Sequence, residues 1–599
     1  MAMGAGPATP CIWSHNFVIL HPRGMEIIES ICRAASLVRG AEMRAHAGYC
    51  DAEPPNSLLL PGEDGLIPDC IPFSAIPHTT KLFSDYLSYA PAVRGFFPHP
   101  PDGGQVASRA AAVPAGTKIH TEVADALERQ NRAWGASEAT LKNIQRLREG
   151  AHAVVTGQQV GLLGGPLLSL LKAASVLALA KQVESAGVPC VPVFWLATED
   201  HDLAEVNQTL LLGNDFELAA FSAPVEGIAD SPVANVRFAA GTDELVQQAA
   251  QMLGDSAVAE CLRNSYREGE TFSRAYAKLY TQLFAGQGLI LLDPADVELH
   301  RIAAPLFVEA IQRAGELDDA LLARNREITA AGYHEQVKVT AESTPLFALV
   351  DGARVPIHRT NGEFKIQKKQ VALDELLRQI ADHPEEFNAN VLLRPVMQDY
   401  WLPTLAYFGG PAEIAYFAQV GVVYEKLLGR VTPILPRMSA TLLEAKIEKL
   451  LNKYALQLQD LFHGEKQLGD EVAVRSLPAG LKLDFERGLL AVEEAMQRIS
   501  ESLHKLDPTL VGAAKNAANK MRYQVGRLEK RAAQAELRKE AVLTRHAAII
   551  ENSLYPRRTL QEREIAGVYF LARYGMGLID QLIEAAGARC QEHKIVRVG

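Results

Sequence analysis

The sequence predicts an α/β protein in which an open parallel sheet is joined to an α-helical antiparallel coiled coil. Three runs rich in β-branched and aromatic residues are separated by a glycine-rich loop, an apolar helix and a long insertion, an order typical of parallel sheets. Closer to the C-terminus, apolar residues recur at alternating spacings of four and three residues, which is the heptad pattern of a coiled coil.

Composition narrows the class of protein. The 599 residues include 60 Lys and Arg against 71 Asp and Glu, and the net charge of −11 gives no overall attraction to nucleic acid. The seven cysteines are odd in number and form no CxxC motif, so they indicate neither a disulfide framework nor a zinc ribbon. This usage fits a reducing compartment, and we expect a cytoplasmic protein of about four structural units at roughly 150 residues each.

The N-terminal part divides into an extension and the first part of the core. Residues 1–70 lack periodicity and are expected to be a poorly ordered extension, whereas the core begins at 71–205. There, 121–148 has helical spacing, 153–155 ends a buried strand, 156–166 is a glycine-rich turn and 167–182 is a helix. The apolar stretch 153–180 is long enough for a membrane span, but it contains Gln158, Gln159 and Lys172, so we expect a buried strand, loop and helix instead.

Two further strands and two insertions follow. The strands are expected at 188–197 and 288–293, with an inserted subdomain at 206–286 because about 80 residues are too many for a plain connection. The core continues at 287–345 and resumes at 390–436. Between them, 346–389 is predicted to be a second insertion with a hairpin that turns at Asp351 and Gly352.

The last third is predicted to be a helical coiled-coil domain, 437–550, followed by a segment, 551–599, that docks on the core. One apolar seam comprises Phe485, Leu489, Val492, Met496, Ile499, Leu503, Leu506 and Leu510, and a second comprises Ala514, Ala518, Met521, Val525, Leu528, Ala532 and Ala535. Asp507 and Pro508 between them suit the start of a new helix. A homodimer through the small alanine seam is one hypothesis, and a purely intramolecular hairpin is the alternative. In the docking segment, Arg563 is expected to pair with a carboxylate.

Three clusters are candidates for chemistry. Two of them, TGQQ and TEDHD, fall at the carboxyl ends of predicted strands, as do Asp293 and Pro294, and ligands of parallel sheets bind at these ends. The loop that contains Thr156, Gly157, Gln158, Gln159 and Gly161 leads into a helix whose N-terminus could hold a nucleotide or an anion. It matches neither the dinucleotide nor the P-loop fingerprint, and tight structural packing is the alternative.

The other two clusters are rich in charge. Glu199, Asp200, His201 and Asp202 suit acid-base chemistry, magnesium binding or the holding of an amine, with a helix N-cap as the alternative. No second His or Cys is near enough in sequence to favour zinc. The third cluster comprises Arg394, Gln398, Asp399, Tyr400, Glu413, Tyr416 and Gln419. Arg394 could bind a carboxylate or phosphate and Glu413 could orient an amine or ribose, or the two could form a buried ion pair.

These motifs resemble a known family. TGQQVGLLGGP with Lys172, VPVFWLATEDHD with Asn207, RPVMQDYWLPTLAYFGGPAEIAYFAQ, LYPRRTLQERE with ARYG, and EHK occur in one order between residue 76 and residue 599. In this order they are similar to the bacillithiol biosynthesis cysteine-adding enzymes, the BshC family. The resemblance implies a Rossmann-like core of the nucleotidyltransferase and class I synthetase type with connecting-peptide insertions, and a coiled-coil domain used for homodimerisation.

The resemblance also implies an activity, which is the joining of the cysteine carboxyl to the amine of glucosaminyl malate in the last step of bacillithiol biosynthesis. ATP is expected to activate the cysteine, with Mg²⁺ as its candidate companion and without zinc. Carried over by position, the catalytic residues would be Glu199, Asp200, His201 and Asp202. The binding residues would be Thr156, Gly157, Gln158, Gln159, Gly161, Lys172, Asn207, Arg394, Gln398, Asp399, Glu413, Tyr416 and Gln419.

Two other functions remain as alternatives from different classes. The chain could be a non-catalytic ligand-binding or scaffold dimer, since a fold alone does not establish turnover. Aminoacylation of tRNA is disfavoured by the acidic balance, so we expect small-molecule substrates and neither nucleic acid nor membrane as a partner.

Overall fold

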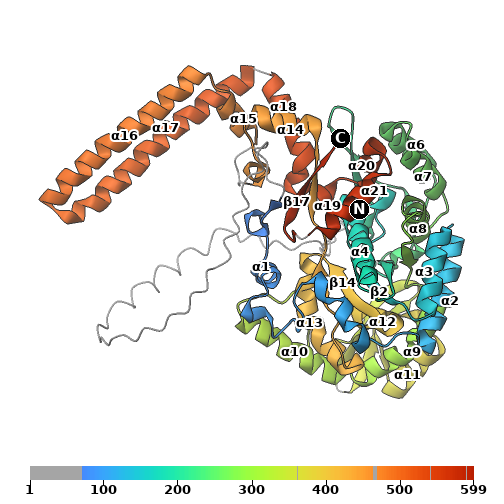
Figure 1. The fold of residues 1–599 in the computed structure, drawn as a ribbon. Coiled ribbons are helices and arrows are strands. Elements are labelled where there is room, and N and C mark those ends of the chain that lie inside the picture. Colours follow the sequence, from blue (N-terminus) through green and yellow to red (C-terminus); the bar gives the residue numbers. More distant parts are fainter. Residues whose placement is uncertain (1–69, 361, 463–467, 540, 589) are drawn as a thin grey trace, which may run out of the picture. The chain divides into compact units, whose positions relative to one another are not determined.

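A computed structural model describes residues 70–360, 362–462, 468–539, 541–588 and 590–599. The predicted extension, 1–70, lies outside the described residues except for Cys70. Within the described residues the predicted fold class is confirmed, because a parallel α/β core is joined to an antiparallel pair of long helices (Figure 1).

The core is a five-stranded sheet in which all neighbouring strands are parallel and their order is β15-β14-β2-β3-β8. Its strands are β2 (His152–Gln158), β3 (Cys190–Leu196), β8 (Ile290–Leu292), β14 (Thr404–Gly409) and β15 (Ile434–Pro436). Every residue of β3 is buried, as expected for a central strand covered on both faces. The chain leaves β2, β3 and β14 at the same edge of the sheet, where the first two candidate clusters and Glu413 of the third follow the strands. Asp399 of the third cluster lies at the opposite edge, beside Thr432 ahead of β15.

The first strand is longer than the sequence predicts. Thr156, Gly157 and Gln158 belong to β2 and pair with β3, so the turn begins only at Gln159. Gly157 lies opposite Trp195, where a Cβ would be 3.3 Å from both the Trp195 Cβ and the Tyr407 hydroxyl. This close approach explains a glycine inside a strand, a position that sequence patterns assign to a turn.

Helices cover the sheet on both faces. The helix α4 (Leu167–Ser185) packs on β2 and β3, as predicted, and α20 (Gly567–Tyr574) and α21 (Leu578–Gly587) pack against it. The helical segment predicted at 121–148 is two helices, α2 (Lys118–Ala133) and α3 (Glu138–Arg148), because Gly135 adopts a φ of 83° and Ser137 caps α3. The remaining helices around the core are α1 (Lys81–Leu87), α9 (Val297–Gln312), α10 (Ala314–Ala330), α12 (Arg394–Trp401) and α13 (Pro411–Leu428).

Two excursions interrupt the core. The first contains α5 (Leu203–Val206), β4 (Thr209–Leu212), β5 (Leu218–Phe221), β6 (Val225–Glu226), β7 (Arg237–Phe238), α6 (Thr242–Leu253), α7 (Ala257–Ser265) and α8 (Phe272–Leu283). The second contains β9 (Leu346–Val350), β10 (Ala353–Thr360), β11 (Glu363–Ile366), β12 (Lys369–Val371), α11 (Leu373–Asp382) and β13 (Phe387–Ala389). The strands β9 and β10 form the predicted hairpin, with Asp351 at a φ of 52° and Gly352 at 83° in its turn.

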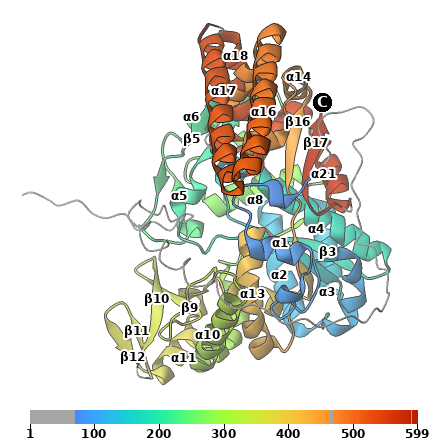
Figure 2. The ribbon, with the colours of Figure 1, turned by 90° about the vertical axis from the view of Figure 1, so that its left-hand side faces the viewer.

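The C-terminal part contains the predicted coiled-coil hairpin. Helices α16 (Ala479–Leu506) and α17 (Val511–Lys539) lie side by side in Figures 1 and 2. The first helix ends at Leu506 because Asp507 is extended and its carboxylate accepts a hydrogen bond from the Thr509 N–H, with Pro508 next in the chain. The other helices are α14 (Ala445–Lys453), α15 (Leu468–Ser476), α18 (Ala541–Leu554) and α19 (Gln561–Glu564). A small sheet has the strand order β1-β17-β16, with β1 (Cys70–Ile71), β16 (Ala440–Glu444) and β17 (His593–Val598).

Buried polar contacts fix the chain after the coiled coil against the core. The Arg437 guanidinium lies 2.6 Å from a Glu562 carboxylate oxygen, and both side chains are almost fully buried. Glu562 also accepts hydrogen bonds from the Ser439 hydroxyl and the Ala440 N–H. Within the described ranges no ion pair of Arg563 occurs, so the expected pairing with a carboxylate is not found there; the preceding residue, Glu562, pairs with Arg437.

The cysteine prediction also needs correction. The structure joins Cys70 and Cys590 in a disulfide across 520 residues of sequence, whereas the cysteine count predicted no disulfide. The pairing follows from β1 lying beside β17, which no spacing rule in the sequence reveals. Among the described residues Cys190 and Cys261 are free.

Candidate functional site

A buried lysine and carboxylate lie where β2 and β14 end. The Lys172 ammonium, only 4% exposed, lies 2.5 Å from a Glu413 oxygen and 2.6 Å from the Gly157 carbonyl. Glu413 also accepts hydrogen bonds from the Tyr407 hydroxyl at 2.7 Å and from the Gly410 N–H at 2.8 Å. Burial raises the pKa of Glu413, but the Lys172 charge outweighs it and the net shift is downward, so Glu413 is an anion whose oxygens are already occupied.

Arg394 lies next to this pair without being part of it. Its guanidinium donates hydrogen bonds to the Gln398 side-chain oxygen at 3.2 Å and to the Tyr416 hydroxyl at 3.3 Å. It stacks over the rings of Trp195 and Tyr407, with 5.5 and 5.2 Å to the centroids. The proposed alternative of an Arg394–Glu413 ion pair is therefore not what the structure shows, and Arg394 has only neutral partners among the described residues.

The four polar residues after β3 point in different directions. Glu199 turns inward, where it accepts hydrogen bonds from Asn388 at 2.7 Å and from His300 at 2.8 Å. Asp202 caps α5 by accepting a hydrogen bond from the Glu205 N–H at 3.1 Å, which is the N-cap alternative drawn from the sequence. Only Asp200 and His201 remain beside the end of the strand.

Asp200 and His201 form a coupled pair. The His201 Nδ1 lies 3.3 Å from a carboxylate oxygen of Asp200, and the Arg354 guanidinium lies 3.6 Å from the same oxygen. Burial raises the pKa of Asp200, but the His201 hydrogen bond and the Arg354 charge outweigh it and hold the pKa at about 2. The Asp200 hydrogen bond raises the pKa of His201 above its usual value. Of these two groups, His201 is therefore the one that can exchange a proton near neutral pH.

The two insertions meet at this pair. The Val233 N–H of the first insertion donates to the Asp200 carbonyl at 2.8 Å, and the Arg354 N–H of the second donates to the Asp230 carbonyl at 2.9 Å. Gln159, from the loop after β2, donates to Asp200 at 3.2 Å and to Glu205 at 2.8 Å. Loop, insertions and strand end thus form one hydrogen-bonded group around Asp200.

The glycine-rich loop is packed by protein atoms. A Cβ at Gly161 would lie 2.8 Å from the Gly165 Cα, which supports the packing alternative for this glycine. The first N–H of α4, on Leu167, donates to the Ile565 carbonyl at 2.8 Å. That group is therefore not free for phosphate, and neither is Lys172, so these contacts do not support the expected phosphate site at this helix N-terminus.

The remaining predicted residues have structural partners. The Thr156 hydroxyl donates to the Phe408 carbonyl, Asn207 bonds the Ala223 backbone twice, and Gln419 bonds Asn325 and the Val337 backbone. Asp399 faces Arg430 and the Thr432 hydroxyl and accepts a hydrogen bond from Gln398. The contacts thus form two groups of predicted residues. One comprises Gly157, Lys172, Arg394, Glu413 and Tyr416, and the other comprises Gln159, Asp200 and His201.

Four contributors were not predicted. Arg354 lies in the second insertion, outside every motif of the sequence, so no sequence pattern indicates that it belongs to the site. Tyr407 could have been predicted, because the strand that contains it leads directly into the helix that contains Glu413. This connection places the Tyr407 hydroxyl near the Glu413 carboxylate. His300 and Asn388 hold Glu199 from elements about 100 and 190 residues away in sequence, a relation that only the fold reveals.

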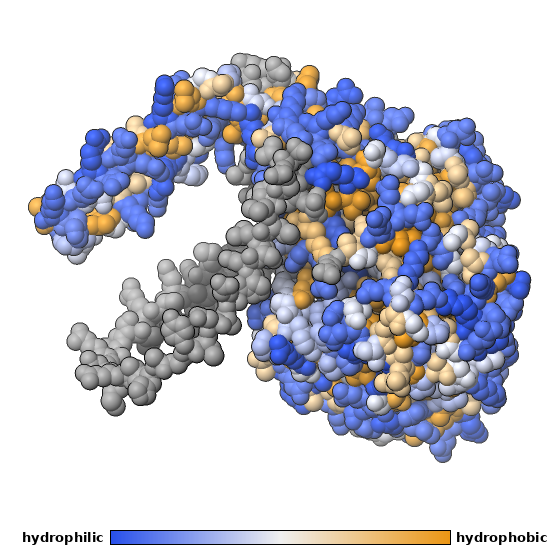
Figure 3. Space-filling view, viewed as in Figure 1, coloured by the Kyte–Doolittle hydropathy of each residue, from blue (hydrophilic) through white to orange (hydrophobic). Residues whose placement is uncertain are grey.

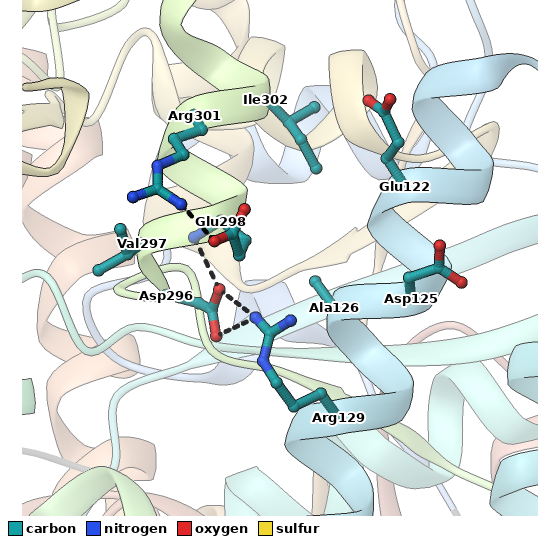
Figure 4. Close-up of a pocket in the computed structure, with 9 residues that line it drawn as sticks. All are labelled: Glu122, Asp125, Ala126, Arg129, Asp296, Val297, Glu298, Arg301 and Ile302. Atoms are coloured by element: carbon teal, nitrogen blue, oxygen red, sulfur yellow. Dashed lines mark hydrogen bonds and ion pairs between the residues drawn. The ribbon is translucent and has the colours of Figure 1, made fainter. Parts of the chain in front are cut away.

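A separate surface hollow of about 780 Å³ lies between α2 and α9 (Figure 4). Its charged side chains largely neutralise one another, because Arg129 pairs with Asp296 and Arg301 pairs with Glu298. No group of three or more His, Cys, Asp or Glu side chains suited to a metal occurs within the described ranges, and the absence of zinc stays a prediction. In the part of the chain that the structure describes, no helix has the length and apolar character needed to cross a membrane.

The fold and site define a Rossmann-like α/β protein that carries an antiparallel coiled-coil domain. Two family models match it, "Bacillithiol biosynthesis BshC, N-terminal Rossmann-like domain" over residues 68–438 and "Bacillithiol biosynthesis BshC, C-terminal coiled-coil domain" over residues 440–598. The chain belongs to the BshC family, as the resemblance predicted.

Several similar proteins carry one name, "Putative cysteine ligase BshC". The protein of Koribacter versatilis is 52% identical over 89% of this chain and 100% of its own length, and that of Solibacter usitatus is 35% identical over 88% and 99%. A solved structure described as a putative arginyl tRNA synthetase from Campylobacter jejuni aligns with a TM-score of only 0.20 at 9% identity, which supports no argument.

Proposed function

We propose that this protein is a cysteine ligase that joins the cysteine carboxyl to the amine of glucosaminyl malate, the last step of bacillithiol biosynthesis. The observation that carries the proposal is the Asp200–His201 pair after β3, in a chain that is 52% identical to a protein named "Putative cysteine ligase BshC". Arg394, whose hydrogen-bond partners are neutral, lies over Trp195 of the same strand. An enzyme that forms an amide needs a group that accepts the proton of the amine and a cation that binds the acid. In this proposal His201 is the proton acceptor and Arg394 is the cation.

The chemistry requires an activated acyl group, because a carboxylate and an amine do not condense spontaneously in water. ATP as co-substrate would convert the cysteine carboxylate into a mixed anhydride and release pyrophosphate or ADP. The amine of the acceptor then attacks the acyl carbon, the C–N bond forms, and AMP or phosphate leaves. His201, oriented by Asp200, takes the proton that the amine loses, and Arg394 holds a carboxylate or phosphate.

The test is direct assay of the purified chain with ATP, cysteine and glucosaminyl malate. We expect amide product with one ATP consumed for each amide formed. His201→Gln should lower kcat about 100-fold, as expected for loss of a general base, with KM little changed. The proposal fails if the wild type forms no amide. Ligand binding without turnover would instead identify a non-catalytic binding protein.

We also propose that the protein is a homodimer through the coiled coil. Apolar side chains of the hairpin stay exposed, among them Ile499, Leu506 at 77%, Met521 and Leu528, and apolar residues are visible along the hairpin in Figure 3. Several of these belong to the predicted heptad seams, so the facing helix does not cover the seams completely. A second copy of the chain, packed against the hairpin, would cover the exposed parts of both seams at once.

Light scattering should give the mass of two chains for the wild type. Ile499→Glu with Leu528→Glu should give the mass of one chain, since charges in an apolar interface oppose association. Exchange of an already polar hairpin residue, Gln524→Glu, serves as the control and should leave the mass unchanged. A wild type that stays monomeric at high concentration contradicts the proposal.

A further inference from the structure

The Arg354 side chain extends from the second insertion to the end of β3. It lies on β10, directly after the hairpin turn, and only 10% of the side chain is exposed. Its guanidinium stacks on the Phe347 ring, with 4.0 Å to the centroid, and donates a hydrogen bond to the Ala389 carbonyl at 3.1 Å. Its backbone N–H donates to the Asp230 carbonyl of the first insertion at 2.9 Å. Contacts from both insertions therefore fix the position of Arg354.

The guanidinium lies beside both members of the Asp200–His201 pair. Its Nη1 is 3.6 Å from the Asp200 Oδ1 and 3.5 Å from the His201 Nδ1. The same Oδ1 lies 3.3 Å from that Nδ1 and accepts a hydrogen bond from the His201 backbone N–H at 2.8 Å. Because 3.6 Å is longer than a good hydrogen bond, Arg354 acts on the carboxylate mainly through its charge.

This arrangement leaves the outer nitrogen of the His201 ring as the proton acceptor. A proton on Nδ1 is directed to the Asp200 carboxylate, so in the neutral ring Nε2 carries the free electron pair. Three charged groups face the ring, namely Asp200 on its own loop, Arg354 from the second insertion and Asp230 from the first. The Asp200 hydrogen bond raises the pKa of the ring most, burial and the Arg354 charge lower it, and the Asp230 charge raises it.

We propose that Arg354 is a positioning residue, which holds the Asp200 carboxylate beside the His201 Nδ1 and places a fixed positive charge next to the ring. The inference rests on the proposed function, in which His201 accepts the proton of the amine. A positive charge next to the ring disfavours the imidazolium, so a larger fraction of His201 is free to accept a proton at neutral pH. The second insertion thereby completes a proton acceptor that lies at the end of β3.

Histidine hydrogen–deuterium exchange of the purified full-length chain, without substrates, tests the proposal. Mass spectrometry of the tryptic peptide 182–237, in which His201 is the only histidine, gives the pH midpoint of protonation of this ring. Arg354→Gln should move the midpoint to higher pH by about 1 unit, because a like charge is removed from the ring. Asp200→Asn should move it to lower pH, because the carboxylate that favours the imidazolium is lost.

Two further variants separate the charge of Arg354 from its packing. Arg354→Met keeps an apolar contact with the Phe347 ring but removes the charge, so it should raise the midpoint as Arg354→Gln does. Arg354→Lys keeps the charge and should raise the midpoint less than either. The matched control is Lys365→Gln, which removes a positive charge from an exposed position on β11 of the same sheet and should leave the midpoint unchanged.

The inference is overturned if Arg354→Gln and Arg354→Met leave the midpoint unchanged or lower it. It is also overturned if Arg354→Lys shifts the midpoint as far as they do, or if Lys365→Gln shifts it equally. In the amide assay, the acidic limb of kcat/KM should move to higher pH together with the midpoint in Arg354→Gln, since this limb reports the free enzyme. If the midpoint moves as expected but the chain forms no amide, Arg354 still sets the charge of His201, and it is the proposed ligase function that fails.

Discussion

Glu413→Ala is expected to lower the free energy of unfolding by about 3–5 kcal/mol, the cost of leaving a buried charge without its partner. The Lys172 ammonium would keep only the Gly157 carbonyl as an acceptor, and the Tyr407 hydroxyl and the Gly410 N–H would also lose theirs. The substitution affects three elements at once, because the Glu413 carboxylate, in the first turn of α13, bonds side chains of α4 and β14.

Urea unfolding followed by circular dichroism measures this loss. Glu425→Ala on the exposed side of the same helix is the control and should stay within about 0.5 kcal/mol of the wild type. Lys172→Met combined with Glu413→Gln should recover most of the stability, since neutral side chains of similar size leave no buried charge. If the double variant is as unstable as Glu413→Ala, the unpaired lysine is not the cause.

His300→Phe is expected to be destabilising by about 3–5 kcal/mol at pH 6 and by less as the pH rises. Both ring nitrogens of His300 face acceptors, the Glu199 carboxylate at 2.8 Å and the Pro384 carbonyl at 3.0 Å, so the ring is held as an imidazolium. Burial lowers its pKa, but the Glu199 hydrogen bond and charge outweigh this and raise the pKa above 6.5.

A raised pKa in the folded state fixes the sign of the pH dependence. The stabilisation is complete below the unfolded pKa of about 6.5 and is lost as the pH rises through the folded pKa, at up to about 1.4 kcal/mol for each pH unit between the two. Urea unfolding from pH 5.5 to pH 9 should therefore show a steeper slope for the wild type than for His300→Phe and Glu199→Gln, in which only other groups such as His201 still contribute. Parallel curves for the wild type and both variants would contradict the imidazolium assignment.

The site illustrates how a predicted motif can hold residues with different tasks. The TEDHD motif after β3 was predicted as one reactive cluster, yet the backbone turns Glu199 toward the core, leaves Asp200 and His201 at the strand end and uses Asp202 as a cap. Adjacent residues at the end of a strand and in the following turn project in different directions, so proximity in sequence did not mean a shared site.

The sequence by itself determined the architecture, because apolar periodicity is a local property. The strand, loop and helix between 152 and 185, the hairpin at Asp351, the heptad helices and the break at Asp507 all follow from spacing and turn residues. It also singled out Arg394 and Glu413 as candidates, because charges amid apolar residues are costly and therefore informative, and the family resemblance added Lys172.

Only the tertiary structure decided which charges pair. Glu413 pairs with Lys172 and not with Arg394, and Glu562 pairs with Arg437. Arg354 reaches Asp200 from an insertion in which the sequence shows no motif. Pairing depends on distances of a few ångströms between segments hundreds of residues apart. No local pattern encodes such distances, because they are set by the packing of the whole sheet and its helices.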